Sequence, residues 1–293
     1  MAAILIVCER VRVEEKQIMS ALADRGLESS PLPPAAIPGG IHLDPTREVS
    51  RPEEPAAQLL IDRCPDRSTA GNLFSLLRSQ NQCLIDGGLA SHGSRLDVSI
   101  ALADSSIPIP PASLVISEAG GMSALRSMEY PCTLFPMTIG RPGLPITDDD
   151  IAEAALEHRH TIGSAGARSM LAVFGAPTGT ETTEYVVVNG KAISRSGDGK
   201  STTQSGEAAH LAIRAAAALQ ASALGVRIAQ IDHELVVWDV SPNPEFRRFV
   251  QIGDRSTATA FADLVLDRIS DGNVSDIKTP VQKERGRDVL IVA

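Results

Sequence analysis

The chain has 293 residues, enough for about two or three compact units with sizeable cores. Hydrophobic residues make up 43% of it and charged residues 22%, a balance typical of a folded globular protein rather than a disordered one. Since aromatic residues contribute only 3%, the core must be mainly aliphatic. The formal net charge of -9 argues against a general binder of nucleic acid or acidic membranes, which needs clustered Lys and Arg.

Targeting and redox signals favour a cytoplasmic protein. Charged residues interrupt the N-terminal region at once, so no signal peptide is indicated, and no apolar run reaches the ~20 residues that span a bilayer. The four cysteines lack C-x-x-C spacing, which gives neither a zinc signature nor a disulfide framework. We expect reduced, mostly buried thiols and neither a membrane nor a nucleic-acid partner.

The first part of the chain, residues 1–88, predicts a small α/β domain. An apolar strand at Ala3–Cys8 precedes a charged helix that stops at Gly26 and a Pro-rich loop over 31–38. The next expected elements are a strand, a helix and a strand, at 59–61, 66–79 and 83–85. This alternation of strands and helices is typical of a parallel sheet.

A smaller α+β unit is predicted over residues 89–175. Its first segment, Leu89–Asp104, has helical apolar spacing, and the I-P-I-P-P that follows forces an extended linker. The expected elements are then a strand, a helix, a strand, a helix and a strand, at 114–116, 118–127, 132–137, from 148 onward, and 170–174.

A third unit is predicted over residues 176–270, followed by a tail at 271–293 that is either mobile or docked as an added strand. Asn189-Gly190 between two strand patterns predicts a type I′ hairpin. The remaining expected elements are a helix, two strands that turn at Asp232-His233, and a last helix, at 206–223, 226–231, 235–240 and 256–269. The G-D-G-K-S-T segment, 197–202, lacks the first glycine of a Walker loop, so we favour a flexible polar loop.

The segment W-D-V-S-P-N-P-E-F-R, Trp238–Arg247, carries a carboxylate from an apolar strand into a Pro-bounded turn. It resembles the metal strand of ATP-grasp ligases, in which an acid and an Asn two residues apart lie on one face and hold magnesium. Further segments resemble the RimK- and LysX-like branch of that superfamily: Glu9–Lys16, Asp62–Ala70, Leu102–Pro111 and Glu129–Met137. The resemblance covers roughly residues 3–270 and is thin between 139 and 183.

This resemblance implies an α/β (α+β) ATP-grasp fold. Residues 1–88 would form a Rossmann-like pre-ATP-grasp domain, and the α+β subdomains at 89–175 and 176–270 would clasp the nucleotide between them. The implied cofactor is Mg-ATP. The implied activity is formation of an amide-type bond to an amino-acid-like substrate through an acyl phosphate, in which positioned charges stabilise the transferred phosphoryl group.

The resemblance also implies site residues, although no catalytic residue is assigned. Arg95 and Phe135 fall at the two positions where the family has phosphate-binding lysines, and Asp239 falls on the metal. Three further departures lower the charge complementarity to Mg-ATP: Gln230 at the first metal acid, Ser241 at the metal-binding Asn, and Glu184 at an arginine. Residues that could hold a substrate or another anion are Arg10, Arg12, Arg63, Arg67, Glu245 and Arg247.

Two hypotheses remain open. The chain is a descendant of carboxylate-amine ligases in which ATP and magnesium chemistry is weakened or lost, and it acts as a homo-oligomer or as the partner of an active paralogue. Alternatively, it is a diverged ligase that still uses Asp239 on the metal and Arg95 on phosphate. For the arginines, a solvated salt-bridged surface is as good an interpretation as an anion site.

Overall fold

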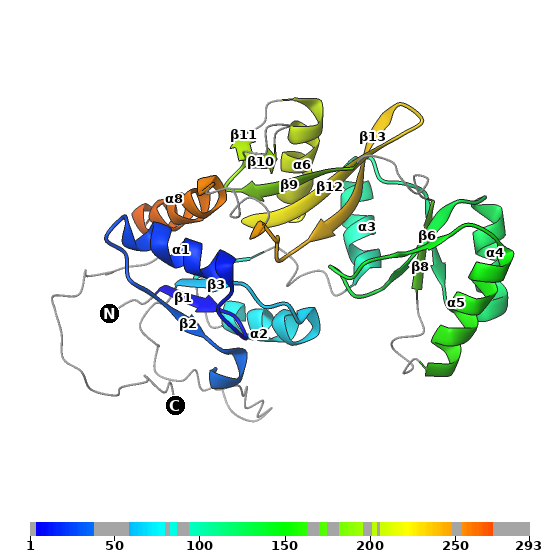
Figure 1. Cartoon of the computed structure of the whole chain (residues 1–293), viewed down its shortest axis with the longest axis horizontal. Coiled ribbons are helices and arrows are strands. Elements are labelled where there is room, and N and C mark those ends of the chain that lie inside the picture. Colours follow the sequence, from blue (N-terminus) through cyan, green and yellow to red (C-terminus); the bar gives the residue numbers. More distant parts are fainter. Residues whose placement is uncertain are drawn as a thin grey trace, which may run out of the picture.

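Three β-sheets divide the computed structural model into three units. In Figure 1 the N-terminal unit and the C-terminal unit lie side by side, and the central unit lies at the far end of the C-terminal sheet. The structure describes residues 4–37, 59–79, 83–86, 94–162, 170–174, 182–195, 201–203, 206–247 and 254–271.

The N-terminal unit is a parallel sheet, as the sequence predicts, but it has four strands and not three. Its spatial order is β2 (Ser29–Leu32), β1 (Ile4–Val7), β3 (Leu59–Asp62), β4 (Cys83–Ile85). Its two α-helices pack on opposite faces of this sheet: α1 (Val13–Ala23) and α2 (Arg67–Ser79). The predicted Pro-rich loop is wrong in part, because Pro31 lies in β2 and a short 3-10 helix, η1 (Pro34–Ala36), follows. An edge strand tolerates proline since one side of it needs no ladder hydrogen bonds.

The central unit is an antiparallel four-stranded sheet. Its spatial order is β5 (Ala112–Val115), β8 (Met170–Phe174), β6 (Cys132–Pro136), β7 (Leu144–Ile146). The two helices of this unit are α4 (Glu118–Ser127) and α5 (Asp149–Ile162). Leu134 packs in the core that they cover, whereas Phe135 packs in a second cluster, as alternation along a strand requires. The sequence missed β7 because it is a three-residue edge strand that contains Pro145.

The C-terminal unit is an antiparallel five-stranded sheet with a helix on each side. Its spatial order is β11 (Ser201–Thr203), β10 (Lys191–Arg195), β9 (Thr182–Val188), β12 (Ala223–Ile231), β13 (Glu234–Ser241). Asn189 and Gly190 have φ of 50° and 70°, which confirms the predicted hairpin turn. The sequence predicts a polar loop over 197–202. This prediction is wrong at residues 201–202, which belong to β11, and residues 196–200 lie outside the described ranges.

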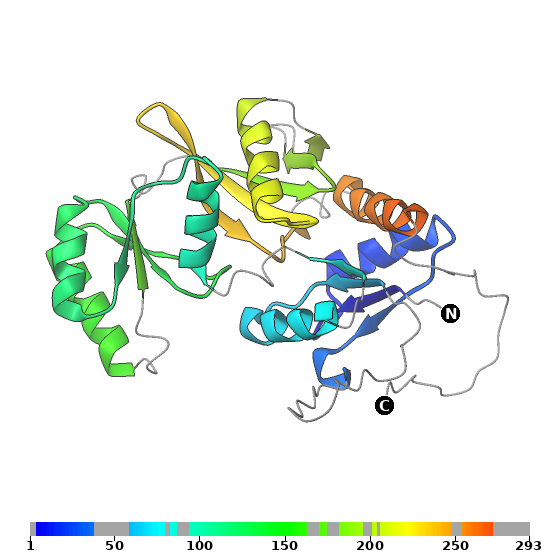
Figure 2. The ribbon, with the colours of Figure 1, turned by 180° about the vertical axis from the view of Figure 1, so that it is seen from behind.

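The two faces of the C-terminal sheet pack against different partners. Val186 and Val188 share one core with α1 and with α8 (Ser256–Ser270), so the N-terminal and C-terminal units are joined by a common hydrophobic core. Tyr185 and Val187 lie in the core beneath α6 (Glu207–Ala218). The helix α3 (Arg95–Asp104), which the sequence grouped with the central unit, packs its apolar side chains into this second core, beside α6 (Figure 2).

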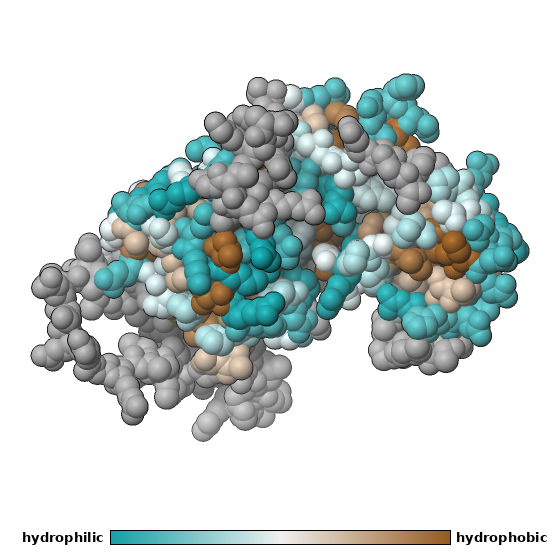
Figure 3. Space-filling model, viewed as in Figure 1, coloured by the Kyte–Doolittle hydropathy of each residue, from teal (hydrophilic) through white to brown (hydrophobic). Residues whose placement is uncertain are grey.

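The surface is mixed in polarity. Among the described residues no helix has both the length and the apolar character needed to cross a membrane. Figure 3 shows apolar residues gathered over the central unit. That unit contributes four exposed large apolar side chains: Leu114, Ile116, Leu144 and Ile151.

The close approach of Gly143 to β6 gives a stability prediction. A β carbon at Gly143 would overlap the Thr133 methyl group and lie 2.8 Å from the Phe135 ring, so we expect Gly143→Ala to cost about 1–3 kcal/mol of unfolding free energy. Gly71, in α2, has open space, and Gly71→Ala should stabilise the protein by up to ~1 kcal/mol. Urea denaturation of both variants checks this, and an equal effect at the two positions would contradict it.

Candidate functional site

A β-bulge in the last hairpin decides where Asp239 points. Ile228 pairs with Val237, but the next residue back on β12, Arg227, pairs with Asp239, so Trp238 is one extra residue on β13. Without it, Asp239 would lie on the same face as Val237, beneath α6. The bulge therefore turns the Asp239 carboxylate to the other face of the sheet, toward the N-terminal and central units.

The Arg95 guanidinium forms an ion pair with the Asp239 carboxylate. It donates to Asp239 Oδ1, to the Pro136 carbonyl oxygen at 3.3 Å and to the Arg141 carbonyl oxygen at 3.1 Å. Its carbon Cζ lies 4.2 Å from the centroid of the Phe135 ring. Arg95 is only 6% exposed and Asp239 is partly buried, so the residue expected on phosphate and the residue expected on metal form an ion pair with each other.

Aromatic side chains close the space between the central and C-terminal sheets. Phe135, 2% exposed, and Trp238 meet edge to face with their centroids 5.8 Å apart. The cavity that remains between the sheets has a volume of ≈ 40 Å³ and is lined by Arg95, Phe135 and Asp239, among others. This space is small beside the roughly 300–1,000 Å³ of a typical small-molecule site.

The expectation that Gln230 stands at the first metal acid is wrong. Gln230 pairs with Leu235 and lines a pocket beside α6, on the face opposite to Asp239. The residue directly across from Asp239 is Arg227, whose Nη2 lies 3.8 Å from Oε1 of Glu184 on the next strand. A guanidinium between two carboxylates therefore occupies the position where the resemblance implies an acid.

The side chains around Asp239 do not fit a magnesium ion. Magnesium needs several oxygen ligands in near-octahedral geometry, with charged oxygen to offset its dehydration. Asp239 forms an ion pair with Arg95 and lies across from Arg227, and the Ser241 hydroxyl donates to the Asn243 carbonyl oxygen at 3.2 Å. In the part of the chain that the structure describes, no three His, Cys, Asp or Glu side chains cluster in a way that could hold a metal ion.

A larger cleft of ≈ 540 Å³ lies where the three units meet. Its floor includes residues from the ends of β12 and β13, and its wall includes residues that follow β1 and β3. Since the chain leaves β1 and β3 toward opposite edges of the parallel sheet, this wall is a topological switch point, the place where open α/β sheets bind ligands. Such a volume is typical of a small-molecule site.

Three of the six substrate or anion candidates line this cleft. Arg12 contacts Glu15 at 3.1 Å and Glu245 at 3.6 Å, and Arg67 contacts Asp62 at 2.9 Å. Glu245 is 75% exposed at the rim. Arg10 and Arg247 are exposed and lie outside the cleft lining, and the sixth candidate, Arg63, lies below it.

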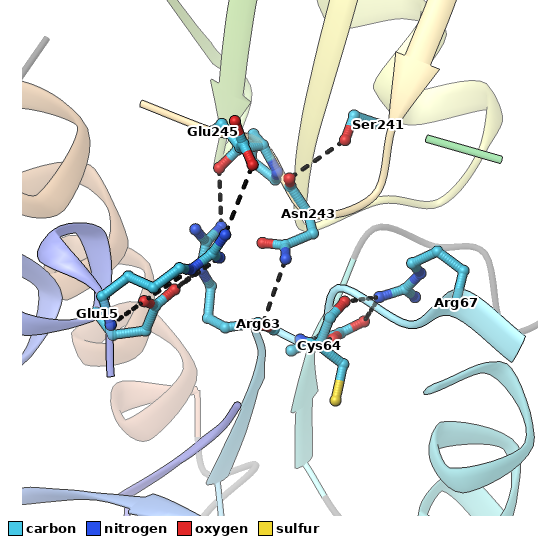
Figure 4. A network of polar contacts seen from close by, with 10 residues as sticks. Glu15, Arg63, Cys64, Arg67, Ser241, Asn243 and Glu245 are labelled. Atoms are coloured by element: carbon cyan, nitrogen blue, oxygen red, sulfur yellow. Dashed lines mark hydrogen bonds and ion pairs between the residues drawn. The ribbon is translucent and has the colours of Figure 1, made fainter. Parts of the chain in front are cut away.

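Arg63 is completely buried and ties the N-terminal unit to the C-terminal unit. Its Nε donates to Glu15 Oε1 at 3.0 Å and its Nη1 donates to the Pro244 carbonyl oxygen at 2.9 Å. Asn243 Nδ2 donates to the Arg63 carbonyl oxygen at 3.3 Å, so the turn after β13 is held from both sides (Figure 4). Burial raises the pKa of Glu15, but hydrogen bonds from Arg12 and the charge of Arg63 outweigh it and hold the pKa below its usual value.

The cysteine beside this network is inert as a nucleophile. Cys64 is buried, and its backbone N–H donates to Asp62 Oδ1 at 2.9 Å. Burial, reinforced by the Asp62 charge, raises the pKa of Cys64 to about 12, so its thiol stays protonated near neutral pH.

Solved structures of one fold class match nearly the whole chain. A RimK-domain ATP-grasp protein from Sphaerobacter thermophilus DSM 20745 superposes with a TM-score of 0.73 at 23% identity, over 90% of this chain and 99% of that one. The ATP-grasp ligase PsnB, in complex with the precursor peptide PsnA2 and AMPPNP, gives 0.64 at 13% identity, over 91% and 97%. D-cycloserine synthetase DcsG gives 0.63 at 14% identity, over 91% and 100%.

The chain has the ATP-grasp fold. No family model matches the sequence, and no curated protein matches it. The fold predicted from the segment Trp238–Arg247 and its companions is thus confirmed, whereas the roles of individual residues within it remain predictions.

Two residues of this ATP-grasp cleft were missed from the sequence. Arg227 could have been found only by counting back from the Asp232-His233 turn and allowing for the bulge. Arg141 lies in the loop between β6 and β7, where the resemblance is thin, and its guanidinium has no ion-pair partner within the described residues.

Removing Glu15 should destabilise the protein strongly, because it leaves the buried Arg63 without a counter-charge. We expect Glu15→Gln to cost about 3–5 kcal/mol of unfolding free energy at pH 7. Since the folded-state pKa of Glu15 lies below the ordinary glutamate value, the contribution of ionised Glu15 is present above that ordinary value and is lost as the pH falls through the folded-state pKa.

Urea denaturation of the wild type and Glu15→Gln at pH 7 and below pH 4.5 measures both effects. The stability difference should narrow at the lower pH. Glu245→Gln, which removes the exposed acid on the same Arg12, is the control and should cost less than ~1 kcal/mol. A pH-independent difference for Glu15→Gln would contradict the assignment.

Proposed function

We propose that this chain is a non-catalytic ATP-grasp protein of the RimK- and LysX-like type, in which Mg-ATP chemistry has been lost and the cleft between the units still binds a ligand. The observation that carries the proposal is the ion pair between the buried Arg95 and the partly buried Asp239. Groups that neutralise each other are not free to neutralise phosphate and metal. A phosphate group or a metal ion would have to compete with this pair for the same charges.

Two further features support the loss of nucleotide chemistry. Phe135 puts an apolar ring where a phosphate-binding lysine is implied, and that ring packs between Arg95 and Trp238. Glu184 puts a carboxylate beside the same cleft, where it would repel the phosphate chain. Losing one cation at roughly 4 Å costs about 4 kcal/mol at a protein-like dielectric.

The cleft offers polar groups to an amino-acid-like ligand. Asn243 is 8% exposed and lines the cleft, and its buried Oδ1 has no hydrogen-bond partner within the described residues. Arg141 presents a guanidinium free of ion pairs within the described residues, which suits a carboxylate. Arg12, Arg67 and Glu245 lie on the same lining.

Besides a small ligand, we propose a protein partner, which is either a second copy of this chain or a paralogue. The central sheet carries exposed apolar side chains on or beside both edge strands, at Leu114, Ile116 and Leu144. Exposed edge strands with apolar side chains are surfaces on which proteins associate. This observation favours a homo-oligomer or a complex over a lone monomer.

Thermal unfolding with and without millimolar Mg-ATP tests the loss of nucleotide chemistry. A ligand at about one hundred times its dissociation constant adds about 2.7 kcal/mol to the unfolding free energy, so retained binding would raise the melting temperature clearly. We expect no shift. A shift that Asp239→Asn abolishes would instead support the alternative, an active diverged ligase with Asp239 on the metal.

A further inference from the structure

The line of charges on the cleft face of the C-terminal sheet alternates in sign across three neighbouring strands. Glu184 on β9, Arg227 on β12 and Asp239 on β13 are direct cross-strand partners, so their side chains point to one face. Neighbouring strands lie about 4.8 Å apart, which keeps the three groups within about 10 Å. All three line the ≈ 540 Å³ cleft.

From this arrangement we infer that Arg227 is a resident cation that takes the place of a divalent metal ion and excludes such ions from the cleft. The inference rests on the proposed loss of Mg-ATP chemistry and names the residue responsible for it. A divalent ion bound to Asp239 or Glu184 would lie within a few ångströms of the Arg227 guanidinium. This repulsion adds to the cost of dehydrating the metal ion. The carboxylates that would offset the two costs are already neutralised by arginine side chains.

The groups around the three residues support the same conclusion. Arg95 on α3 forms an ion pair with Asp239, and Arg227 is the cross-strand neighbour of the same carboxylate. Glu184 and Arg227 are each about half exposed, and their contact at 3.8 Å is loose enough to be reached by solvent ions. Exclusion is therefore a matter of charge and not of steric access.

The test uses Mn²⁺ alone, without nucleotide, on the full chain. Arg227→Asp replaces the cation by a third carboxylate between two existing ones. Lys191→Asp makes the same charge change at an exposed position on β10, whose partner on β9 is Val188, and is the matched control. We expect Arg227→Asp to bind Mn²⁺ at least about tenfold more tightly than Lys191→Asp, measured by the loss of the free-ion electron paramagnetic resonance signal.

Further variants serve as controls for this test. Arg227→Lys retains the charge and should bind no more Mn²⁺ than the wild type, and Arg227→Asn against Lys191→Asn repeats the comparison if the acidic variant does not fold. Equal Mn²⁺ affinity at the two positions would overturn the inference. So would Mn²⁺ binding by the wild type that Asp239→Asn removes. Metal-free ATP binding by the wild type would overturn the proposed function but leave this inference standing.

Discussion

The contact between Arg95 and Asp239 is the constraint on which the site depends. An ion pair that is partly buried must offset the desolvation of its charges, and here Arg95 does so with carbonyl acceptors at Pro136 and Arg141 and with the face of the Phe135 ring. Its members come from α3 and β13, and its acceptors from the central unit. The pair therefore links α3 and the central unit to β13, beside the ≈ 40 Å³ cavity.

Internal charge pairing extends beyond this contact. Arg63 pairs with Glu15, Arg67 with Asp62, and Arg227 with Glu184, so cations that could face a ligand mostly face the protein. The first pair joins α1 to the residue after β3, and the third joins two neighbouring strands of the C-terminal sheet. The pairs therefore stabilise the individual units, and recognition in the cleft is left to few groups, with Arg141 the clearest.

Most of the fold follows from local patterns, and the site does not. Apolar runs and the Asn189-Gly190 turn indicate strands and hairpins directly, because the backbone at those residues has few alternatives. Edge strands with proline, such as β2 and β7, lack that signal. The packing of α3 is also invisible in the sequence, since helical apolar spacing predicts a buried face but not which core it joins.

The sequence prediction that put Gln230 beside Asp239 failed because of the bulge in β13. A one-residue bulge changes the partner of every residue beyond it, and a sequence pattern carries no mark for the bulge at Trp238. Yet that one residue turns Asp239 toward Arg95 and Arg227, and places the indole against Phe135. The strand geometry that presents the carboxylate is therefore intact, while the side chains around it bind one another. The backbone that positions these side chains does not depend on the sign of their charge. A change of a few charged residues can therefore alter the chemistry of the site while the fold stays the same.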